Sequence, residues 1–358
     1  MGLPLVSRVI AWDSGAHAGA PLPNDEMTTA KKTRVAVIGV GDFGRNHVRV
    51  YKELDSAHLA GIVDANPERA QAVAAEFGTH VLPGVESLAG NVDAVSLAVP
   101  TIEHARLGCH LLEQGIDVLV EKPMAASLGE ADDLICAAQE HKRVLQVGHL
   151  ERFNPAVVAA QAVVRDPLFF EVHRLGVFSP RSLDIDVIYD VMIHDLDILL
   201  ALVNPAPSVR PLGVLDLKAV GIPVVTDKVD IAHARIEFES GAVANVTASR
   251  VSTERVRKMR LFQAHEYVSL DYTRQDAIRI RVTEPGLQPQ FAFEQLPAQK
   301  EEPLKAQLRS FLAAVEQRTT PVVDGAAGRR ALELADRVMA GILEHNRRVQ
   351  VSAPNTKA

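Results

Sequence analysis

The sequence predicts an α/β domain built on a doubly wound parallel sheet, followed by an α+β domain with an open, mostly antiparallel sheet. Three observations support this. Residues 34–148 alternate short apolar runs with segments of helical spacing, which is typical of parallel strands joined by crossover helices. After Pro155 the chain consists mainly of long strand-like runs, two of them joined by the hairpin signal Ser240-Gly241. A chain of 358 residues is long enough for two cores.

The first domain is organised around residues 34–51, RVAVIGVGDFGRNHVRVY. A buried strand, a glycine turn and the start of a helix would give this pattern. Gly39 would make the tight turn, Gly41 would let the backbone approach a pyrophosphate, and Gly44 would let the helix pack on the strand. The free N–H groups at the helix start would face the phosphates. This turn predicts a dinucleotide site.

A second strand at residues 58–63 ends in Asp64, about twenty residues after the glycines. A carboxylate there can accept hydrogen bonds from the adenosine ribose hydroxyls and repels a 2′-phosphate. Ala65 and Asn66 follow, with no Arg or Lys beside Asp64, so NAD is expected rather than NADP; Arg69 in the next helix is the one reservation. Strand, glycines, helix, strand and acid in this order predict a Rossmann dinucleotide-binding domain. A flavodoxin-like domain that binds no dinucleotide is the alternative.

The remaining elements of the first domain follow in chain order. Residues 66–68 are typical of an N-cap, a proline at the first helical position and an early acid. Ser127 with Glu130 forms a capping-box pattern. Helices are expected to about Phe77, at 104–114 and after Ser127, and further strands near 79–82 and at 92–99, 117–120 and 143–147. The sheet is therefore expected to have six strands.

Sheets of this kind bind ligands beyond the carboxyl ends of their strands. Pro100-Thr101, Glu121-Lys122 and Gly148 all follow expected strands. His104 lies close enough to a strand end to touch the cofactor, although a plain helix-surface histidine would fit the pattern as well. The expected cofactor contacts are Gly39, Gly41, Phe43, Gly44, Asp64, Pro100, Thr101, His104 and Glu121.

The second domain is predicted because the sequence pattern changes after residue 150 to long strand-like runs. The expected strands are 168–178, 209–220, 229–239, 242–250, 258–270, 277–282 and 290–296, and the expected helices are 156–164, 186–203, 305–317 and 326–347. This gives a mobile tail at 1–30, an NAD-binding domain at 31–150, a substrate and oligomerisation domain at 151–348 and a tail at 349–358. The closing helices can pack back on the first domain, and Met27 is a candidate for the true start.

Composition narrows the class of protein. The formal net charge of −7 gives no sign of a nucleic-acid or acidic-membrane partner. No apolar run is long enough to span a bilayer, and no basic region precedes the first apolar residues as in a secretory signal. Cys109 and Cys136 share no metal or redox spacing and are expected to be small buried residues. A cytoplasmic protein is expected.

Three motifs together resemble the Gfo/Idh/MocA family of oxidoreductases over about residues 32–347. They are the glycine turn, Glu121-Lys122-Pro123, and Asp190 with His194 four residues later. The resemblance implies an NAD-dependent dehydrogenase acting on a CH–OH group, with Lys122, Asp190 and His194 catalytic. It also implies a Lys-Pro bond that is often cis and a homodimer or homotetramer formed through the open sheet.

Within this family, three further segments are similar to the enzymes that oxidise the 3-hydroxyl of UDP-N-acetylglucosamine to a ketone, for lipid A or surface-sugar synthesis. These segments are residues 148–155, 174–181 and 192–197. Another sugar or polyol dehydrogenase of the family is the alternative among enzymes. A non-catalytic dinucleotide-binding sensor is the alternative from another class, although it need not keep Lys122, Asp190 and His194.

The residue types suit the implied chemistry. Oxidation of a secondary alcohol needs a proton acceptor at the hydroxyl and a partner for the developing negative charge. Lys122, at a strand end, can supply the positive charge, although a surface lysine before a turn proline would look the same. His194 is the natural base, and Asp190, on the same helix face, could orient it or bind a neighbouring hydroxyl. A satisfied core histidine and a zinc pair are the alternatives; no further ligand cluster is evident, so no metal is expected.

The substrate side is expected to carry arginines, because a nucleotide-sugar diphosphate favours bidentate guanidinium contacts. The candidates are Arg152, Asn154, Arg174 and Arg181. Each could instead be an ordinary polar residue flanking a strand. Arg250, Lys258 and Arg260 are expected on a solvated or interface face of the sheet.

Overall fold

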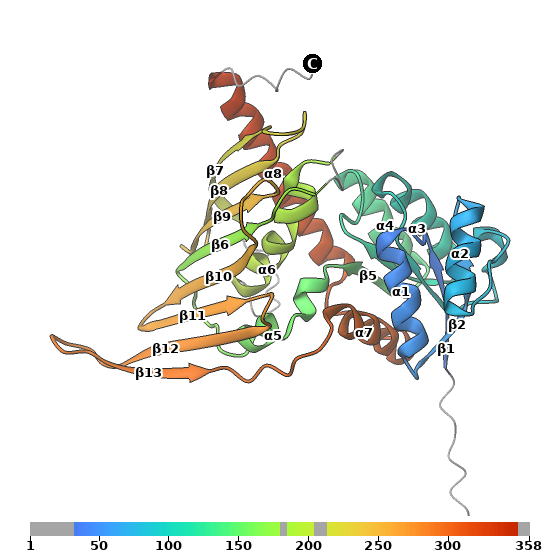
Figure 1. The fold of residues 1–358 in the computed structure, drawn as a ribbon, viewed down its shortest axis with the longest axis horizontal. Coiled ribbons are helices and arrows are strands. Elements are labelled where there is room, and N and C mark those ends of the chain that lie inside the picture. Colours follow the sequence, from blue (N-terminus) through green and yellow to red (C-terminus); the bar gives the residue numbers. More distant parts are fainter. Residues whose placement is uncertain (1–31, 180–184, 204–212, 350–358) are drawn as a thin grey trace, which may run out of the picture. The chain divides into compact units, whose positions relative to one another are not determined.

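The computed structural model describes residues 32–179, 185–203 and 213–349 (Figure 1). The expected tail at 1–30, nearly all of the expected tail at 349–358, Met27 and Arg181 lie outside these ranges. Among the described residues, no helix is long and apolar enough to cross a membrane.

The first sheet has five parallel strands in the order β2-β1-β3-β4-β5. The strands are β1 Thr33–Ile38, β2 Ala57–Val63, β3 Ala94–Leu97, β4 Asp117–Glu121 and β5 Leu145–Gly148, and the helices between them are α1 Asp42–Glu53, α2 Pro67–Phe77, α3 His104–Glu113 and α4 Leu128–Glu140. β3, β4 and β5 are buried along their whole length, which explains why consecutive residues within them are apolar rather than alternating with exposed polar ones. The expected caps form: the side chains of Asn66 and Ser127 accept from the backbone N–H groups of Arg69 and Glu130.

The expectation of six strands in this sheet was wrong. Residues 79–82 form only an isolated bridge, in which Val81 lies opposite Ile62 of β2. The Ile62 N–H donates to His80, and the Leu82 N–H donates to Ile62. Pro83 follows at once and has no N–H to continue the ladder. The segment therefore touches the edge of the sheet at one point and leaves it.

The second sheet has eight strands in the order β13-β12-β11-β10-β6-β9-β8-β7, antiparallel except for the β6–β9 pair. Its strands are β6 Phe169–Leu175, β7 Val214–Ile222, β8 Ile231–Phe238, β9 Val243–Ser249, β10 Val256–Gln263, β11 Glu266–Asp271, β12 Asp276–Glu284 and β13 Gln290–Gln295. The single strand expected at 258–270 is two strands, β10 and β11, because the chain reverses between Gln263 and Glu266. That turn has no glycine; His265 adopts a φ of 62° instead, so no residue in the turn predicts it.

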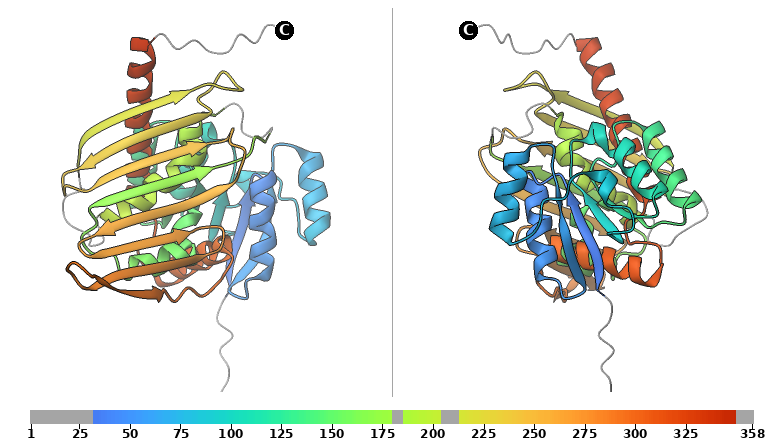
Figure 2. Two further views of the ribbon diagram at one scale, coloured as in Figure 1. Left: turned by 60° about the vertical axis from the view of Figure 1, so that its left-hand side comes forward. Right: turned by 90° about the vertical axis from the view of Figure 1, so that its right-hand side faces the viewer.

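Helices cover one face of the second sheet. α5 Pro155–Gln161, α6 Ile193–Val203 and α8 Gly325–Val349 lie on that side, whereas the left view of Figure 2 shows the other face with no helix in front of it. In β8 the inward residues are buried and the alternate ones exposed, as expected for a sheet covered on one side. Residues 186–203 are not a single α-helix: a π-helical turn, Ile188–Met192, precedes α6.

The closing helices join the two sheets. In α7, Pro303–Gln317, the side chains of Leu308 and Phe311 share a core with Val35 and Val37 of β1. α8 lies so close to β5 that a Cβ on Gly328 would be 2.6 Å from Val147 Cγ2. Further along, α8 packs on β7, where Gly341 faces Ala219.

Candidate active and cofactor-binding site

The glycine turn between β1 and α1 has one open position between two tightly packed ones. Gly39 has a φ of +82°, and a Cβ there would lie 2.6 Å from the Ala98 carbonyl oxygen. A Cβ on Gly44 would lie 1.8 Å from the Gly39 carbonyl oxygen, whereas one on Gly41 would meet nothing within 4 Å. The turn thus leaves free space at Gly41, beside the N-terminus of α1. This fits a pyrophosphate held by backbone N–H groups.

Asp64, at the end of β2, is tied to the same turn. Its carboxylate accepts from the Val40 N–H at 2.7 Å and from the Asn66 N–H at 2.8 Å. Arg69 adds a bidentate pair, with Nη2 2.7 Å from Oδ1 and Nε 3.1 Å from Oδ2. Burial would raise the pKa of Asp64, but the hydrogen bonds from Arg69, Asn66 and Val40 outweigh it and lower that pKa below its usual value. The reservation about Arg69 was justified, because the first turn of α2 brings this cation onto Asp64.

The other cofactor candidates divide into accessible and buried groups. Phe43 is exposed on α1, and Pro100 and Thr101 begin a short 3₁₀ turn after β3. His104 is buried, with Nδ1 2.9 Å from the Pro123 carbonyl oxygen and Nε2 2.9 Å from the Val99 carbonyl oxygen. Both ring nitrogens of His104 are thus engaged with backbone carbonyls. We interpret it as a brace between the two loops rather than as a cofactor contact.

Glu121, the last residue of β4, is buried where two neighbouring elements meet it. A Cβ on Gly148 would lie 2.4 Å from Glu121 Oε1, so only glycine leaves room for this carboxylate at the end of β5. On the other side, Nε2 of His47 lies 3.2 Å from Glu121 Oε1, and its ring meets Phe43 edge-on. His47 was not among the expected site residues; its position on the buried face of α1 was the available signal.

Lys122 and Asp190 are brought together from elements 68 residues apart. The Lys122–Pro123 peptide is cis. Lys122 Nζ donates to the Asp190 backbone carbonyl at 2.7 Å and to its carboxylate Oδ1 at 3.1 Å. Asp190 lies in the π-helical turn, so its relation to His194 is not the α-helical one that was expected. Its carboxylate fixes Lys122 beyond the end of β4.

His194 and His149 lie side by side next to this pair. Their ring centroids are 6.2 Å apart and the rings are perpendicular. Nδ1 of His194 and both ring nitrogens of His149 are buried without a hydrogen-bond partner among the described residues. Burial, together with Lys122, Arg174, His149 and Arg257, lowers the pKa of His194 well below 6.5. A neutral His194 can accept a proton. His149 was not among the expected site residues, because one histidine after a strand carries no pattern.

Arg174 is at the centre of a buried ionic network. Its Nε and Nη2 bind the two carboxylate oxygens of Asp195 at 2.6 and 2.9 Å, and Nη1 binds Glu151 at 2.8 Å. The guanidinium also stacks over the Tyr272 ring, 4.7 Å from its centroid. With each of its three nitrogens bonded to a carboxylate, Arg174 fixes β6 against α6 and the segment after β5. Its three guanidinium nitrogens are therefore engaged within the chain, and we interpret Arg174 as a positioning residue; the expected phosphate contact stays a prediction.

Asn154 is similarly committed. Its side chain caps α5 by accepting from Ala156 N–H, and its Nδ2 donates to Glu151 and to the Tyr272 carbonyl. Arg152 keeps more freedom. Its Nη1 lies 3.3 Å from Asp197 Oδ1, while its Nε has no hydrogen-bond partner among the described residues. Of the substrate candidates that the structure describes, Arg152 alone retains an unengaged buried donor.

Three other expectations concerned residues outside the site. Arg250 is buried and donates to Asp230, Thr226 and the Ile185 carbonyl, so the expectation of a solvated or interface position was wrong for it. Lys258 and Arg260 are partly exposed beside Asp271 and Glu171. Cys136 is exposed rather than buried. Among the described residues, no three His, Cys, Asp or Glu side chains gather as a metal site.

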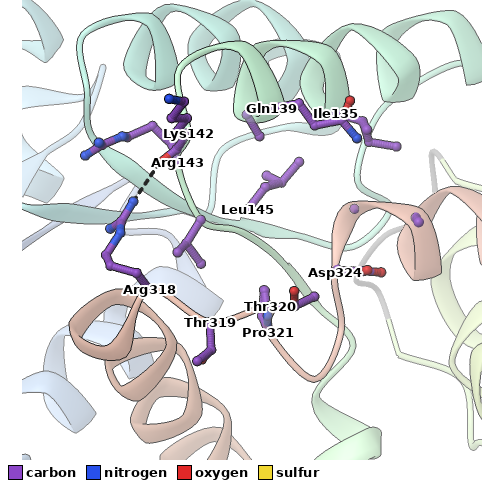
Figure 3. Close-up of a pocket in the computed structure, with 14 residues that line it drawn as sticks. Ile135, Gln139, Lys142, Arg143, Leu145, Arg318, Thr319, Thr320, Pro321 and Asp324 are labelled. Atoms are coloured by element: carbon purple, nitrogen blue, oxygen red, sulfur yellow. Dashed lines mark hydrogen bonds between the residues drawn. The ribbon is translucent and has the colours of Figure 1, made fainter. Parts of the chain in front are cut away.

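A cavity of about 520 Å³ lies away from these residues. It is lined by the end of α4, the start of β5 and the segment between α7 and α8 (Figure 3). Lys142, Arg143 and Arg318 meet at one end of it, where Arg318 donates to the Lys142 carbonyl at 2.7 Å. Because the strands of this sheet are parallel, the start of β5 marks the edge opposite to the glycine turn. This cavity is therefore separate from the candidate site.

Comparison with known proteins gives a consistent result. Residues 33–149 match the family described as "Oxidoreductase family, NAD-binding Rossmann fold" under the name GFO_IDH_MocA. The chain is 41% identical over 313 residues to the UDP-N-acetylglucosamine 3-dehydrogenase of Acidithiobacillus ferrooxidans, covering 86% of this chain and 97% of that enzyme. It is 26% identical over 329 residues to an inositol 2-dehydrogenase of Rhizobium meliloti, covering 87% of this chain and 97% of that enzyme.

A solved structure of the Acidithiobacillus ferrooxidans enzyme superposes with a TM-score of 0.80 at 39% identity, over 87% of this chain and 98% of that chain. A levoglucosan dehydrogenase in complex with NADH and levoglucosan gives a TM-score of 0.77 at 19% identity, over 88% of this chain and 98% of that chain. The second likeness is one of fold alone.

Proposed function

The chain belongs to the Gfo/Idh/MocA family of NAD-binding oxidoreductases, and from this we propose that it oxidises the 3-hydroxyl of UDP-N-acetylglucosamine to a ketone with NAD. The observation that carries the proposal is the contact of Lys122 Nζ with Asp190. It joins the end of β4 to the turn before α6, and so sets an ammonium group beside His194 at the cofactor edge of the sheet. The choice of substrate is inferred from the similarity to the Acidithiobacillus ferrooxidans enzyme.

In the proposed reaction, the glycine turn and Asp64 would hold NAD, which would accept the hydride from the sugar carbon. His194, kept neutral by its lowered pKa, takes the proton of the sugar hydroxyl. The ammonium group of Lys122 faces the oxygen on which negative charge develops and stabilises it more in the transition state than in the ground state. Asp190 anchors Lys122, so that this stabilisation needs little reorganisation during the reaction.

Arg152 is the described residue that we assign to the diphosphate of the substrate. Arg181 lies outside the described residues, and we keep it as a second candidate for the diphosphate on the basis of the sequence alone. Arg174 and Asn154 hold the loop that carries Arg152, through Glu151. Contacts to the remote UDP group would help to position the reacting carbon. We also propose that residues 31–150 serve the cofactor and residues 151–348 the substrate, with a second copy of the chain packing on the helix-free face of the open sheet.

A small panel of UDP-sugars and free sugars tests the proposed function. With NAD and a carbonyl trap present, UDP-N-acetylglucosamine is expected to give NADH, whereas N-acetylglucosamine without UDP is expected to be a very poor substrate. The readout is absorbance of NADH together with mass spectrometry of the trapped ketone. Turnover of a free polyol or aldose, with none of the UDP-sugar, would leave only the family assignment. Cofactor binding without turnover of any alcohol would favour the sensor alternative.

Cofactor choice gives a second prediction. Asp64 repels a 2′-phosphate, but Arg69 lies against it and would become free to bind that phosphate once the carboxylate is removed. Asp64→Ser is therefore expected to shift the ratio of NAD to NADP affinity toward NADP by about tenfold or more. Calorimetric titration with each dinucleotide measures this. The double variant Asp64→Ser/Arg69→Gln is the matched control and should lose the gain in NADP affinity. Tighter binding of NADP than of NAD by the unmodified protein would contradict the proposed preference.

A further inference from the structure

His149 is a buried histidine that the proposed reaction leaves unused. It follows β5 directly and is 1% exposed. Neither of its ring nitrogens has a hydrogen-bond partner among the described residues. Buried polar groups in proteins are normally paired, as both nitrogens of His104 are. The packing of His149 within the chain does not account for its two unpaired nitrogens.

His149 lies near both groups that are proposed to act on the sugar hydroxyl. Its ring meets the ring of His194 edge-on, with the centroids 6.2 Å apart. The charged groups that act on it come from the end of β4, the segment after β5 and α6, and they are Glu121, Lys122, Arg152 and Asp197. Two of these elements also carry the proposed catalytic pair: Lys122 follows β4, and His194 lies on α6. A ligand group that reached both of them would come within reach of His149.

The charge state of His149 limits what it can bind. Burial, with Lys122 and Arg152, lowers its pKa, and Asp197 and Glu121 only partly oppose this. At neutral pH the ring is therefore uncharged, with one N–H that donates and one nitrogen that accepts. Such a ring matches a group that both donates and accepts, such as a hydroxyl or an acetamide. It does not match a phosphate, which needs donors alone.

We propose that His149 is a substrate-binding residue that holds a group on a carbon next to the one oxidised, donating from one ring nitrogen and accepting at the other. This inference rests on the proposed function. In UDP-N-acetylglucosamine oxidised at C3, those neighbours are the acetamido group on C2 and the hydroxyl on C4, and each both donates and accepts. His149 would thereby turn the 3-hydroxyl toward His194 and Lys122. It would also select among sugars by the neighbour that it holds.

Steady-state kinetics of His149→Phe test this role. Phenylalanine keeps an aromatic ring in the same place and removes both polar nitrogens. The expected result is a loss of about 10- to 100-fold in kcat/KM for the UDP-sugar, the scale of one or two buried hydrogen bonds, with a raised KM and an NAD affinity within about twofold of the unmodified protein. His110→Phe is the matched control, because His110 is partly exposed on α3 beside Glu86, and its kinetics should not change.

A second variant separates binding from folding. His149→Ala leaves a buried space the size of the lost ring, which small aromatic molecules can fill. Added imidazole is expected to restore at least part of kcat/KM, whereas thiophene, a ring of similar size without the two nitrogens, is not. Equal rescue by both molecules would mean that the ring only fills space, and would overturn the proposal. Unchanged kinetics in His149→Phe, or a fall in NAD affinity equal to the fall in kcat/KM, would overturn it too.

Two further substrates identify the neighbour. If His149 holds the C2 acetamido group, the ratio of kcat/KM for UDP-N-acetylglucosamine to that for UDP-glucose should fall in His149→Phe. If it holds the C4 hydroxyl, the ratio to UDP-N-acetylgalactosamine should fall instead, and if neither ratio changes the proposal is wrong. Turnover by the unmodified protein reports separately on the proposed function. A protein that oxidises UDP-N-acetylglucosamine normally without His149 would refute this inference and leave that function intact.

Discussion

Replacing Lys122 with Met is expected to lower kcat by roughly 100- to 1,000-fold, the scale of losing one group aimed at developing negative charge. Lys122 Nζ is held by Asp190 at the end of β4, and methionine fills a similar volume without the charge. NAD affinity should be nearly unchanged, because the glycine turn and Asp64 do not contact Lys122. Steady-state kinetics and calorimetric NAD titration together measure the two quantities.

Lys52→Met is the matched control for this variant. Lys52 is an exposed lysine in the last turn of α1 and donates to the Gly78 carbonyl. Its replacement should leave kcat unchanged. If Lys122→Met lost NAD affinity while keeping kcat at saturating cofactor, Lys122 would be a cofactor contact rather than the partner of the alkoxide.

Replacing His194 with Asn is expected to lower kcat by about 100-fold, the usual scale for a general base. Because the pKa of His194 is lowered, the neutral base persists below pH 6.5, and the acid limb of kcat/KM in the unmodified protein should lie below that pH. His194→Asn should lose this limb, since asparagine does not titrate. A variant with near-normal kcat across the pH range would show that another group accepts the proton.

The same pKa shift predicts a change in stability. The unfolded chain binds a proton at His194 near pH 6.5, whereas the folded protein resists protonation there until a lower pH. The contribution of His194 to folding stability is therefore fully present above about pH 6.5. It is lost as the pH falls below that value, because the unfolded state then binds more protons than the folded state. Thermal unfolding of His194→Asn should depend less on pH in that acid range than unfolding of the unmodified protein. The buried His149 contributes in the same direction, so the dependence should weaken rather than vanish.

Sequence periodicity determined most of the first domain. The five strands, four helices and their caps were predictable because each depends on neighbours within a few residues: an apolar run for a buried strand, Asn66 or Ser127 for a helix start, and a glycine for a left-handed turn. The family assignment was confirmed by the 41% identity to one of its dehydrogenases over most of the chain. The sequence was less informative where a turn lacked glycine, as at His265, or where a short segment paired at only one point, as at Val81.

The partners of the charged side chains were decided by the tertiary structure alone. Arg174 and Asn154 have the composition of substrate contacts, but the packing of β6 against α6 commits Arg174 to Asp195 and Glu151, and the start of α5 commits Asn154 to a cap. The pairing of Arg69 with Asp64 is more local, because the first turn of α2 brings Arg69 back onto the end of β2. A side chain several atoms long can reach many groups, and the sequence does not state which of them the fold brings within about 3 Å.

The roles of the histidines depended on the tertiary structure most of all. By sequence alone, His104 and His149 each follow a strand at the same edge of the sheet. In the fold, both nitrogens of His104 meet backbone carbonyls, whereas both nitrogens of His149 are unpaired beside His194. The local sequence determined the strands, the glycine turn and the position of Lys122, because those depend on short-range sterics and periodicity. Which polar atoms stay free to bind a ligand depends on contacts between residues far apart in the chain, and only folding creates those contacts.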